Sequence, residues 1–369
     1  MYFYGGMVWR MVEVDRIMKE NLRPSHLPTQ SSTASLVCLY EPQNTCCEFI
    51  QHEGFIPSEQ TESTEMTTFR DRLHDLSRPQ LFGTCILSPS PHFLQAARAT
   101  SLDFVFLDTE HVPLDRHQLS WMCRAYDAAG IAPIVRVPSV LDASGSVTSV
   151  LDGGAVGVVS PYTETLDQVL ALVGMSKLRP LKGSTLQLAL GILKQQAHKN
   201  HALAEQSTVA STPGYVDPLP FLSELLPVET LACMRKENDG TVLFLNIEST
   251  LGMSNLSLLL SVPGVDGVFV GPKDLSVQLG VPEQWESDTF VNACDTIVKI
   301  TVRRGLSVGN HYSFDHAVEY QNHWRTLGAN LVVHSTDMKL FQNALLADFK
   351  QLRGDRTRGE GGGTAVADV

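Results

Sequence analysis

The sequence predicts an α/β protein, a (β/α)8 TIM barrel with a rim insertion between strands 4 and 5 and a poorly ordered N-terminal extension. Short β-branched runs alternate with amphipathic helical segments eight times over about 270 residues, which is typical of a closed parallel barrel. The main alternative is a doubly wound open sheet, whose first strand usually leads into a Gly-rich phosphate-binding turn. Here the first predicted strand leads into LSPSPHF, which contains no glycine. The barrel is therefore favoured.

The composition is that of a globular protein with a large core. Of the 369 residues, 43% are hydrophobic and 18% are charged, which suits one large domain or two smaller ones. The net charge of −12 disfavours a nucleic-acid partner, because phosphate binding needs clustered Lys and Arg. The sequence contains no apolar run as long as the roughly 20 residues that a membrane-spanning helix needs, so no membrane partner is expected.

The cysteines and the first residues bear on the cellular compartment. Seven cysteines are scattered through the chain without any C-x-x-C spacing, so we expect reduced thiols rather than a zinc or redox site. The first residues are interrupted by Arg10, Glu13 and Asp15 and lack a small-residue cleavage site, which disfavours a secretory signal. The prediction is a cytoplasmic protein.

The two ends of the chain differ from the middle. Residues 1–75 show no sustained hydrophobic period and contain Ser/Thr-rich runs, which cannot bury enough apolar surface to become ordered. We therefore expect a disordered N-terminal extension over 1–75, the barrel over 76–353 and a flexible tail over 354–369.

Within the barrel region, eight short apolar runs are predicted strands because they are rich in β-branched residues and bounded by turn formers. In chain order they are Leu81–Leu87, Phe104–Asp108, Ile134–Val137, Gly157–Ser160, Val242–Glu248, Gly267–Val270, Leu306–Val308 and Leu331–Val333. Helical patterns fill the gaps, for example over 115–130, 165–178 and 288–305. The gap over about 182–238 is longer than one crossover helix requires, so we expect a rim insertion that acts as a lid or a contact surface.

Polar residues gather where the predicted strands end and the βα loops begin. In chain order they are Asp108, Glu110, His111, Arg136, Ser160, Asn246, Glu248, Lys273 and Asp274. Each alone has a structural explanation, such as an ion pair or a helix cap. The carboxyl ends of parallel barrel strands meet at one rim, however, so their coincidence predicts a single polar cavity there.

Glu248 and Asp274 are the candidate ligands of a divalent cation. A carboxylate at the end of the apolar run VLFLNIE is costly to bury unless a cation or hydrogen bonds compensate. Two carboxylates form an incomplete oxygen shell, which suits Mg²⁺ or Mn²⁺ with water and substrate completing it. Such an ion can chelate a 2-oxo acid and stabilise its enolate. Arg136 supplies positive charge for the oxyanion, and His111 is a natural proton shuttle.

These motifs resemble the HpcH/HpaI family of class II pyruvate aldolases, within the phosphoenolpyruvate/pyruvate barrel superfamily. The matching segments are LDTEH (107–111), IVRVP (134–138), VLDGGAVGVVSP (150–161), NIES (246–249), VDGVFVGPKDLSVQLG (265–280) and GANLVVHSTD (328–337). The resemblance implies a carbon–carbon lyase that reversibly cleaves a 4-hydroxy-2-oxo acid to pyruvate and an aldehyde through a metal-bound enolate. It implies Mg²⁺, Mn²⁺ or Co²⁺ as the cofactor.

Residue by residue, the resemblance implies that Glu248 and Asp274 hold the metal and that His111 is the catalytic base. It implies that Arg136 stabilises the transition state and that Asp152 raises the basicity of His111. Members of the family are typically homo-oligomers, often hexamers, that exchange their last helix between neighbours. Residues 338–353 form an amphipathic candidate for that helix.

The resemblance also implies substrate contacts from four positions at the same rim. They are Arg136, Asn246, Lys273 (through its backbone N–H) and Asp274, with Asp108 and Glu110 as secondary candidates. Asn246 stands where bacterial aldolases carry Gln, and Lys273 stands where Ala or Ser is usual. The Lys273 side chain could bind a second substrate carboxylate or point to solvent. These departures leave the aldehyde partner open.

Other interpretations remain open at this point. An oxaloacetate decarboxylase, or an enzyme similar to macrophomate synthase, would use the same enolate. A CoA-ester lyase of the citrate-lyase β type is disfavoured because no basic surface suits the CoA phosphates. A non-catalytic barrel that acts as an interaction protein is the alternative from another class, supported by the long N-terminus and the insertion.

Overall fold

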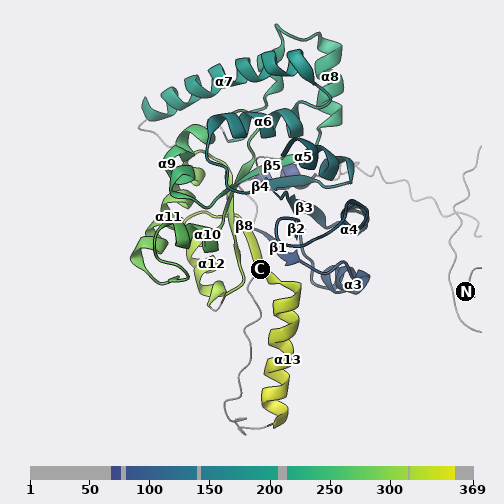
Figure 1. The fold of residues 1–369 in the computed structure, drawn as a ribbon, viewed down its shortest axis with the longest axis vertical. Helices are drawn as coiled ribbons and strands as arrows, with labels where there is room; N and C mark the ends of the chain where they lie inside the picture. Colours follow the sequence, from purple (N-terminus) through teal and green to yellow (C-terminus); the bar gives the residue numbers. More distant parts are fainter. Residues whose placement is uncertain (1–67, 76–79, 139–142, 207–213, 315, 354–369) are drawn as a thin grey trace, which may run out of the picture. The chain divides into compact units, whose positions relative to one another are not determined.

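The chain folds around a closed barrel of eight parallel strands that pair in sequence order, and β8 pairs with β1. The computed structural model describes residues 68–75, 80–138, 143–206, 214–314 and 316–353 (Figure 1). The strands are β1 (Leu81–Ile86), β2 (Phe104–Asp108), β3 (Ala132–Arg136), β4 (Gly157–Ser160), β5 (Val242–Ile247), β6 (Gly267–Val270), β7 (Ser307–Tyr312) and β8 (Leu331–Thr336). The predicted (β/α)8 barrel is therefore confirmed.

Helices follow the strands and surround the barrel. They are α2 (Phe69–His74), α3 (Pro91–Ala99), α4 (Arg116–Ala128), α5 (Ala143–Asp152), α6 (Leu166–Lys177), α7 (Gly183–Gln206), η1 (Leu219–Leu222), α8 (Val228–Glu237), α9 (Thr250–Leu259), α10 (Pro272–Gln278), α11 (Asp288–Arg303), α12 (Ala317–Thr326) and α13 (Asp337–Arg353). Several begin at side-chain caps. The side chains of Asp115 and Thr165, for example, accept hydrogen bonds from the backbone N–H groups three residues later.

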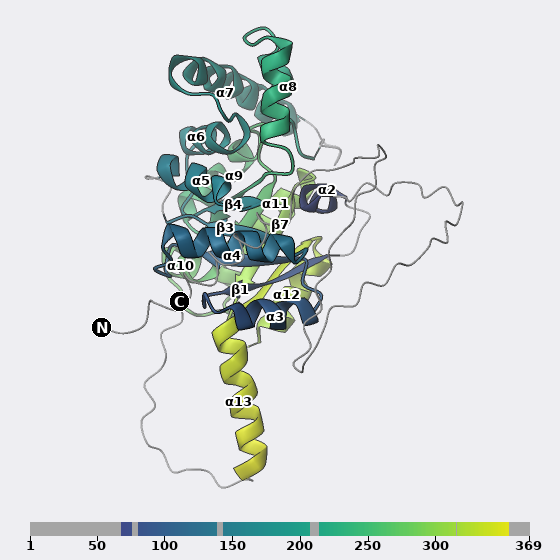
Figure 2. The ribbon, with the colours of Figure 1, turned by 90° about the vertical axis from the view of Figure 1, so that its right-hand side faces the viewer.

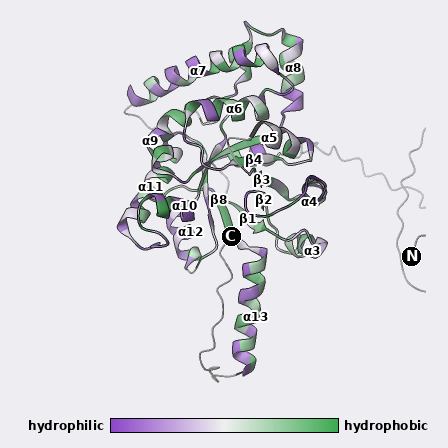
Figure 3. Cartoon of the chain, viewed as in Figure 1, coloured by the Kyte–Doolittle hydropathy of each residue, from purple (hydrophilic) through white to green (hydrophobic). Residues whose placement is uncertain are grey.

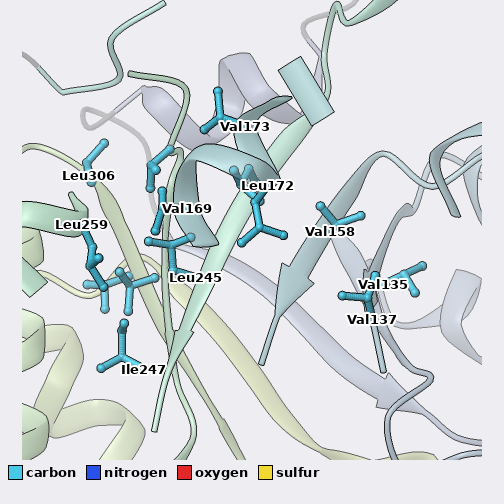
Figure 4. Packing of buried hydrophobic residues seen from close by; sticks show 14 of the residues in the cluster. Val135, Val137, Val158, Val169, Leu172, Val173, Leu245, Ile247, Leu259 and Leu306 are labelled. Carbon is cyan, nitrogen blue, oxygen red and sulfur yellow. The ribbon is translucent and has the colours of Figure 1, made fainter. Parts of the chain in front are cut away.

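The alternation of side chains along the strands makes two cores. Inward-facing aromatic residues, among them Phe104, Phe244 and Phe269, fill the barrel interior. Outward-facing aliphatic residues pack against the helices, and Figure 4 shows Leu245 of β5 facing Val169 of α6. Successive residues of a strand point to opposite faces, and both faces of this sheet are buried. The strands are therefore nearly continuous apolar runs in the sequence.

The strand bounds differ from the prediction mainly at the last two strands. β2, β4 and β6 have the predicted bounds, and β1, β3 and β5 are shifted by one or two residues at their ends. β7 was predicted to stop at Val308 but continues to Tyr312, and β8 continues to Thr336. Gly309 and Asn310, which follow the predicted end of β7, are both buried within the parallel ladder.

The barrel begins before the predicted boundary at residue 76. Residues 68–75 form the capped helix α2, whose Phe69 and Leu73 are buried in the interior core. The oxygen of Leu73 accepts a hydrogen bond from Ser307 Oγ, which ties the helix to β7. The rest of the predicted extension, residues 1–67, and the predicted tail over 354–369 lie outside the described residues.

The predicted insertion is present and lies beside the outer helices. α7 runs next to α6 (Figures 1 and 2), and Asn200 Nδ2 donates to the backbone oxygen of Ser261, 3.0 Å away. Further along, the backbone oxygen of Val216 accepts a hydrogen bond from Gly264, just before β6. The described part of the insertion therefore reaches the N-terminal ends of the strands. None of the described residues of the insertion lines the cavity at their carboxyl ends, so this part of the insertion forms no lid there, and a contact surface stays a prediction.

The helix α13 projects away from the barrel (Figures 1 and 2) and exposes many apolar side chains. None of the helices that the structure describes is both long and apolar enough to cross a membrane.

Candidate active site

At the carboxyl ends of β2 and β3, Asp108 and Arg136 form a buried ion pair. The two residues are register partners across the neighbouring strands, and each lies two positions after a residue of the interior core (Phe106 and Ile134), so both side chains point into the barrel. Arg136 Nε donates to Asp108 Oδ1 at 2.9 Å and Arg136 Nη2 to Asp108 Oδ2 at 2.6 Å, a bidentate geometry. Burial alone would raise the pKa of Asp108, but the guanidinium outweighs it and holds that pKa below its usual value. Arg136 is thus fixed in place and charged.

Glu110 lies on the other side of the same guanidinium. Its Oε2 is 3.2 Å from Arg136 Nη1. Burial raises the pKa of Glu110 to about 6, although Arg136 opposes the shift. His111, the next residue, has an exposed side chain at the mouth of the cavity. The loop after β2 therefore places an anchored carboxylate and an accessible imidazole side by side.

At the ends of β5 and β6, Glu248 and Asp274 are held by one tyrosine. The backbone N–H of Tyr162 donates to Glu248 Oε1 at 2.6 Å, and its hydroxyl donates to Asp274 Oδ1 at 2.9 Å. Asn246 Nδ2 donates to Glu248 Oε2, also at 2.6 Å. Tyr162 has a φ of +44°, a left-handed conformation that costs a non-glycine residue roughly 1–3 kcal/mol. In this left-handed conformation, the backbone N–H and the hydroxyl of Tyr162 each donate to one of the two carboxylates.

The charge on Glu248 is not balanced by these contacts. The side chain is almost fully buried, and burial, together with the nearby Asp274, raises its pKa to about 8. The backbone N–H of Tyr162 and the charge of Arg136 act in the opposite direction but do not cancel the effect. A cation bound beside the two carboxylates would stabilise both in their ionised forms.

The residues present fit a hard divalent cation. Gly271 allows the end of β6 to lie directly against the carboxylate of Glu248. A Cβ at this position would lie 2.2 Å from Glu248 Oε2, so a side chain there would displace the carboxylate. Within the described part of the chain, no group of three or more His, Cys, Asp or Glu side chains could hold an ion together. The protein thus offers two carboxylates, the small donor set with which Mg²⁺ or Mn²⁺ keeps water or substrate ligands.

A single cavity brings the predicted residues together. Six of the predicted site residues line it: His111, Arg136, Asn246, Glu248, Lys273 and Asp274. Asp108 and Glu110 do not line the cavity themselves; each instead contacts Arg136, which does. The predicted convergence of strand ends on one rim is therefore present in the structure.

Asp152 is the exception. It is the last residue of α5, before β4 begins, so it lies toward the N-terminal ends of the strands, whereas His111 follows the carboxyl end of β2. Its side chain is largely exposed and pairs with Arg179 at 3.1 Å. Within one chain, the predicted pairing of Asp152 with His111 is not formed. A contact between them would need a second copy of the chain.

Four residues of the site were missed at the level of sequence. Tyr162 was hidden because it follows Ser160-Pro161 in a loop, and Trp285 and Phe314 lie in loops after α10 and β7. His311 lies within β7, beyond the predicted end of that strand, and stacks on Phe106 with ring centroids 5.5 Å apart. Burial lowers its pKa to about 4, so the imidazole is neutral at pH 7. Alternation from Val308 would have placed His311 inside the barrel.

Comparison with known proteins gives a consistent family. The model of the HpcH/HpaI aldolase/citrate lyase family matches residues 82–344, well over half of the chain. A hydroxypyruvate/pyruvate aldolase of Deinococcus radiodurans is 28% identical over 286 residues, covering 77% of this chain and 88% of that protein. A 2-keto-3-deoxy-L-rhamnonate aldolase of Escherichia coli is 25% identical over 285 residues, covering 75% and 92%.

Solved structures share the fold. An HpcH/HpaI aldolase from Desulfitobacterium hafniense superposes with a TM-score of 0.57 at 20% identity, covering 76% of this chain and 96% of that one. Macrophomate synthase superposes with a TM-score of 0.57 at 23% identity, covering 79% and 90%. At these identities the likeness concerns the fold and not the substrate.

Proposed function

This chain belongs to the HpcH/HpaI aldolase/citrate lyase family, and from that premise we propose that it is a metal-dependent carbon–carbon lyase. The proposed reaction is the reversible cleavage of a 4-hydroxy-2-oxo acid to pyruvate and an aldehyde. The observation that carries the proposal is the pair Glu248 and Asp274 in one cavity with Arg136 and His111. The two relatives named as aldolases of 2-oxo acids support the substrate class.

We propose that Glu248 and Asp274 hold a divalent cation, Mg²⁺ or Mn²⁺. The buried carboxylate of Glu248, with its raised pKa, lacks a full counter-charge from the described residues around it. When bound, a divalent cation supplies Lewis-acid polarisation of the substrate's 2-oxo group. Asn246 orients Glu248 through the bond to Oε2, so its role combines carboxylate positioning with the predicted substrate contact.

The remaining chemistry falls to Arg136 and His111. We propose that His111 accepts the proton of the C4 hydroxyl as the C3–C4 bond breaks and the aldehyde forms. The electron pair of that bond becomes the C2=C3 double bond while the π pair of the 2-oxo group moves onto its oxygen, and the fixed charge of Arg136 stabilises this developing oxyanion. Proton return to C3 then gives pyruvate. The exposed position of His111 at the mouth suits exchange of its proton with solvent.

The last helix is the surface we propose for assembly into a homo-oligomer. α13 carries a set of exposed apolar side chains, visible as green patches along the helix in Figure 3. They are Met338, Leu340, Phe341, Leu345, Leu346, Phe349 and Leu352. A stripe of this kind on a projecting helix marks an interaction site. Light scattering of the intact protein should give a mass above that of one chain.

Two assays test the proposed function. The metal-loaded protein should release pyruvate from a 4-hydroxy-2-oxo acid, EDTA should abolish the release, and Mn²⁺ or Mg²⁺ should restore it. It should also exchange the methyl protons of pyruvate with deuterium from the solvent, without any aldehyde. Activity that EDTA leaves intact would point to a Schiff-base lysine instead. Release of CO₂ from oxaloacetate without aldol turnover would favour a decarboxylase.

A further inference from the structure

The outer part of the cavity has an aromatic wall made of Trp285 and Phe314. Both residues line the cavity that contains Glu248 and Asp274. Their rings are stacked, with centroids 4.0 Å apart and planes 7° apart. Trp285 lies between α10 and α11, and Phe314 follows β7, so two separate loops meet to form the wall.

The wall is held in place from behind. The ring of Trp285 meets the edge of Phe290 at 5.4 Å, and Phe314 meets Tyr312 at 4.3 Å, both in edge-to-face geometry. Phe290 and Tyr312 are fully buried. The two wall residues are therefore fixed by the core, yet each keeps part of its surface exposed.

The position of the wall separates two halves of the cavity. Arg136 and Glu248 are buried at the closed end, where charge is concentrated. Trp285 and Phe314 are only partly buried, and Trp285 also borders a second hollow. A substrate whose oxo-acid part occupies the charged end would therefore place its remaining part beside the wall. Apolar surface that stays exposed next to such a site favours binding of an apolar group.

We propose that Trp285 and Phe314 bind the aldehyde half of the substrate and select an aldehyde with a flat, apolar body, such as an aromatic one. The inference rests on the proposed lyase function and names its second substrate. Lys273 and Glu283 line the same cavity, so an aldehyde with a charged group is the competing outcome.

The test compares aldehydes in the addition of pyruvate by the metal-loaded protein. The wild type should use benzaldehyde with a kcat/KM at least about tenfold above that for glycolaldehyde or glyoxylate. Trp285→Leu keeps an apolar side chain but removes the flat ring, and should lower kcat/KM for benzaldehyde about tenfold, mainly through KM. Its effect on glycolaldehyde should stay within about twofold. Trp285→Phe should restore most of the benzaldehyde activity.

The matched control is Trp121→Leu, because Trp121 is an exposed tryptophan on α4 that does not line the cavity. Trp121→Leu should leave the ratios of kcat/KM between the aldehydes unchanged. Equal losses for all aldehydes in Trp285→Leu would reduce the wall to a structural role and overturn the inference. A preference for glyoxylate would overturn it in favour of a charged partner. Loss of both aldol turnover and deuterium exchange in the wild type would instead remove the proposed function, and this inference with it.

Discussion

Two of the buried carboxylates of the barrel, one at each end, have opposite electrostatic surroundings. Asp266, just before β6 at the N-terminal end, is fully buried. It contacts Lys177 Nζ at 2.6 Å, His74 Nε2 at 2.9 Å and Arg70 Nε at 3.2 Å. Burial alone would raise the pKa of Asp266, but Lys177 and the other partners outweigh it and hold that pKa below its usual value.

Glu248, at the carboxyl end of β5, is almost as deeply buried but has no such set of cations. Its hydrogen-bond donors among the described residues are neutral, the backbone N–H of Tyr162 and the amide of Asn246, and a second carboxylate, Asp274, lies nearby. Its pKa is raised to about 8. The comparison separates two surroundings of a buried carboxylate: Asp266 is neutralised by cations of its own chain and fastens the fold, whereas the pKa of Glu248 stays raised, and we propose that an external cation supplies the missing positive charge.

The largest effect is expected for Glu248→Gln, which keeps the size of the side chain and removes its charge. The variant should lose at least about 10³-fold in kcat/KM, because several kcal/mol of transition-state stabilisation depend on the cation. Its free energy of unfolding should stay equal or rise, because a carboxyl group whose ionisation is penalised by burial is replaced by a neutral amide. Steady-state kinetics measures the loss of kcat/KM, and urea unfolding measures the free energy of unfolding. A loss of stability without loss of activity would make Glu248 a structural residue.

The opposite result is expected for Asp266→Asn. The substitution leaves Lys177, Arg70 and His74 without their common anion, which should cost about 3–5 kcal/mol in the free energy of unfolding. Urea unfolding measures it. The matched control is Asp167→Asn, because Asp167 pairs with Lys194 at the surface and should change stability by less than about 1 kcal/mol. Equal effects in both variants would contradict the fastening role of Asp266.

His111→Ala tests the catalytic end without touching either buried charge. The variant should lower kcat by about 10²–10³, the lower part of the range for a general base, because solvent can reach an exposed position and replace it in part. Its stability should not change. A wild-type rate in His111→Ala would assign proton transfer to another group.

A smaller effect is expected for Tyr162→Phe, which removes only the hydroxyl bonded to Asp274. Groups that orient ligands typically contribute 10- to 100-fold to metal affinity, and we expect about tenfold weaker Mn²⁺ binding. Titration of the purified variant with Mn²⁺ measures it. Unchanged affinity would mean that the backbone N–H alone organises the pair.

The smallest effect concerns pH. Because the folded-state pKa of Asp266 lies below its unfolded value, its stabilisation is complete above about pH 4 and is lost as the pH falls through the folded pKa. Urea unfolding of the wild type and Asp266→Asn should therefore differ by a constant amount between about pH 5 and 7. The difference should shrink only in stronger acid. A difference that already shrinks as the pH falls from 7 to 5 would contradict a lowered folded-state pKa of Asp266.

Much of the fold and the core of the site could be predicted from sequence. Apolar runs with polar ends located the strands, and Glu248 and Asp274 could be placed at one rim because parallel strands share a direction. The role of Asp152 beside His111 came only from the resemblance, and it stays a prediction, because the contact would need a second copy of the chain to supply Asp152. Asp152 ends a helix and therefore lies at the other end of the barrel.

Other features depend on tertiary contacts that a linear pattern does not contain. Tyr162 has a left-handed backbone conformation, and the segment PYTET contains no pattern that predicts it. Nor does the segment predict that the N–H and the hydroxyl of Tyr162 donate hydrogen bonds to two carboxylates. Asp266 sits among small residues before a short strand, and its partners Arg70 and His74 come from a segment that resembled the disordered extension. Residues that are distant in sequence form both the fastened end and the aromatic wall.

The central claim is that the carboxyl end of the barrel holds a divalent cation and the N-terminal end does not. Calorimetric titration with Mn²⁺ tests it directly, on the wild type, Glu248→Gln, Asp274→Asn and Asp266→Asn. One ion should bind per wild-type chain, binding should be lost in the first two variants, and it should persist in folded Asp266→Asn. Absence of binding to the wild type, or unchanged binding to Glu248→Gln and Asp274→Asn, would contradict the claim.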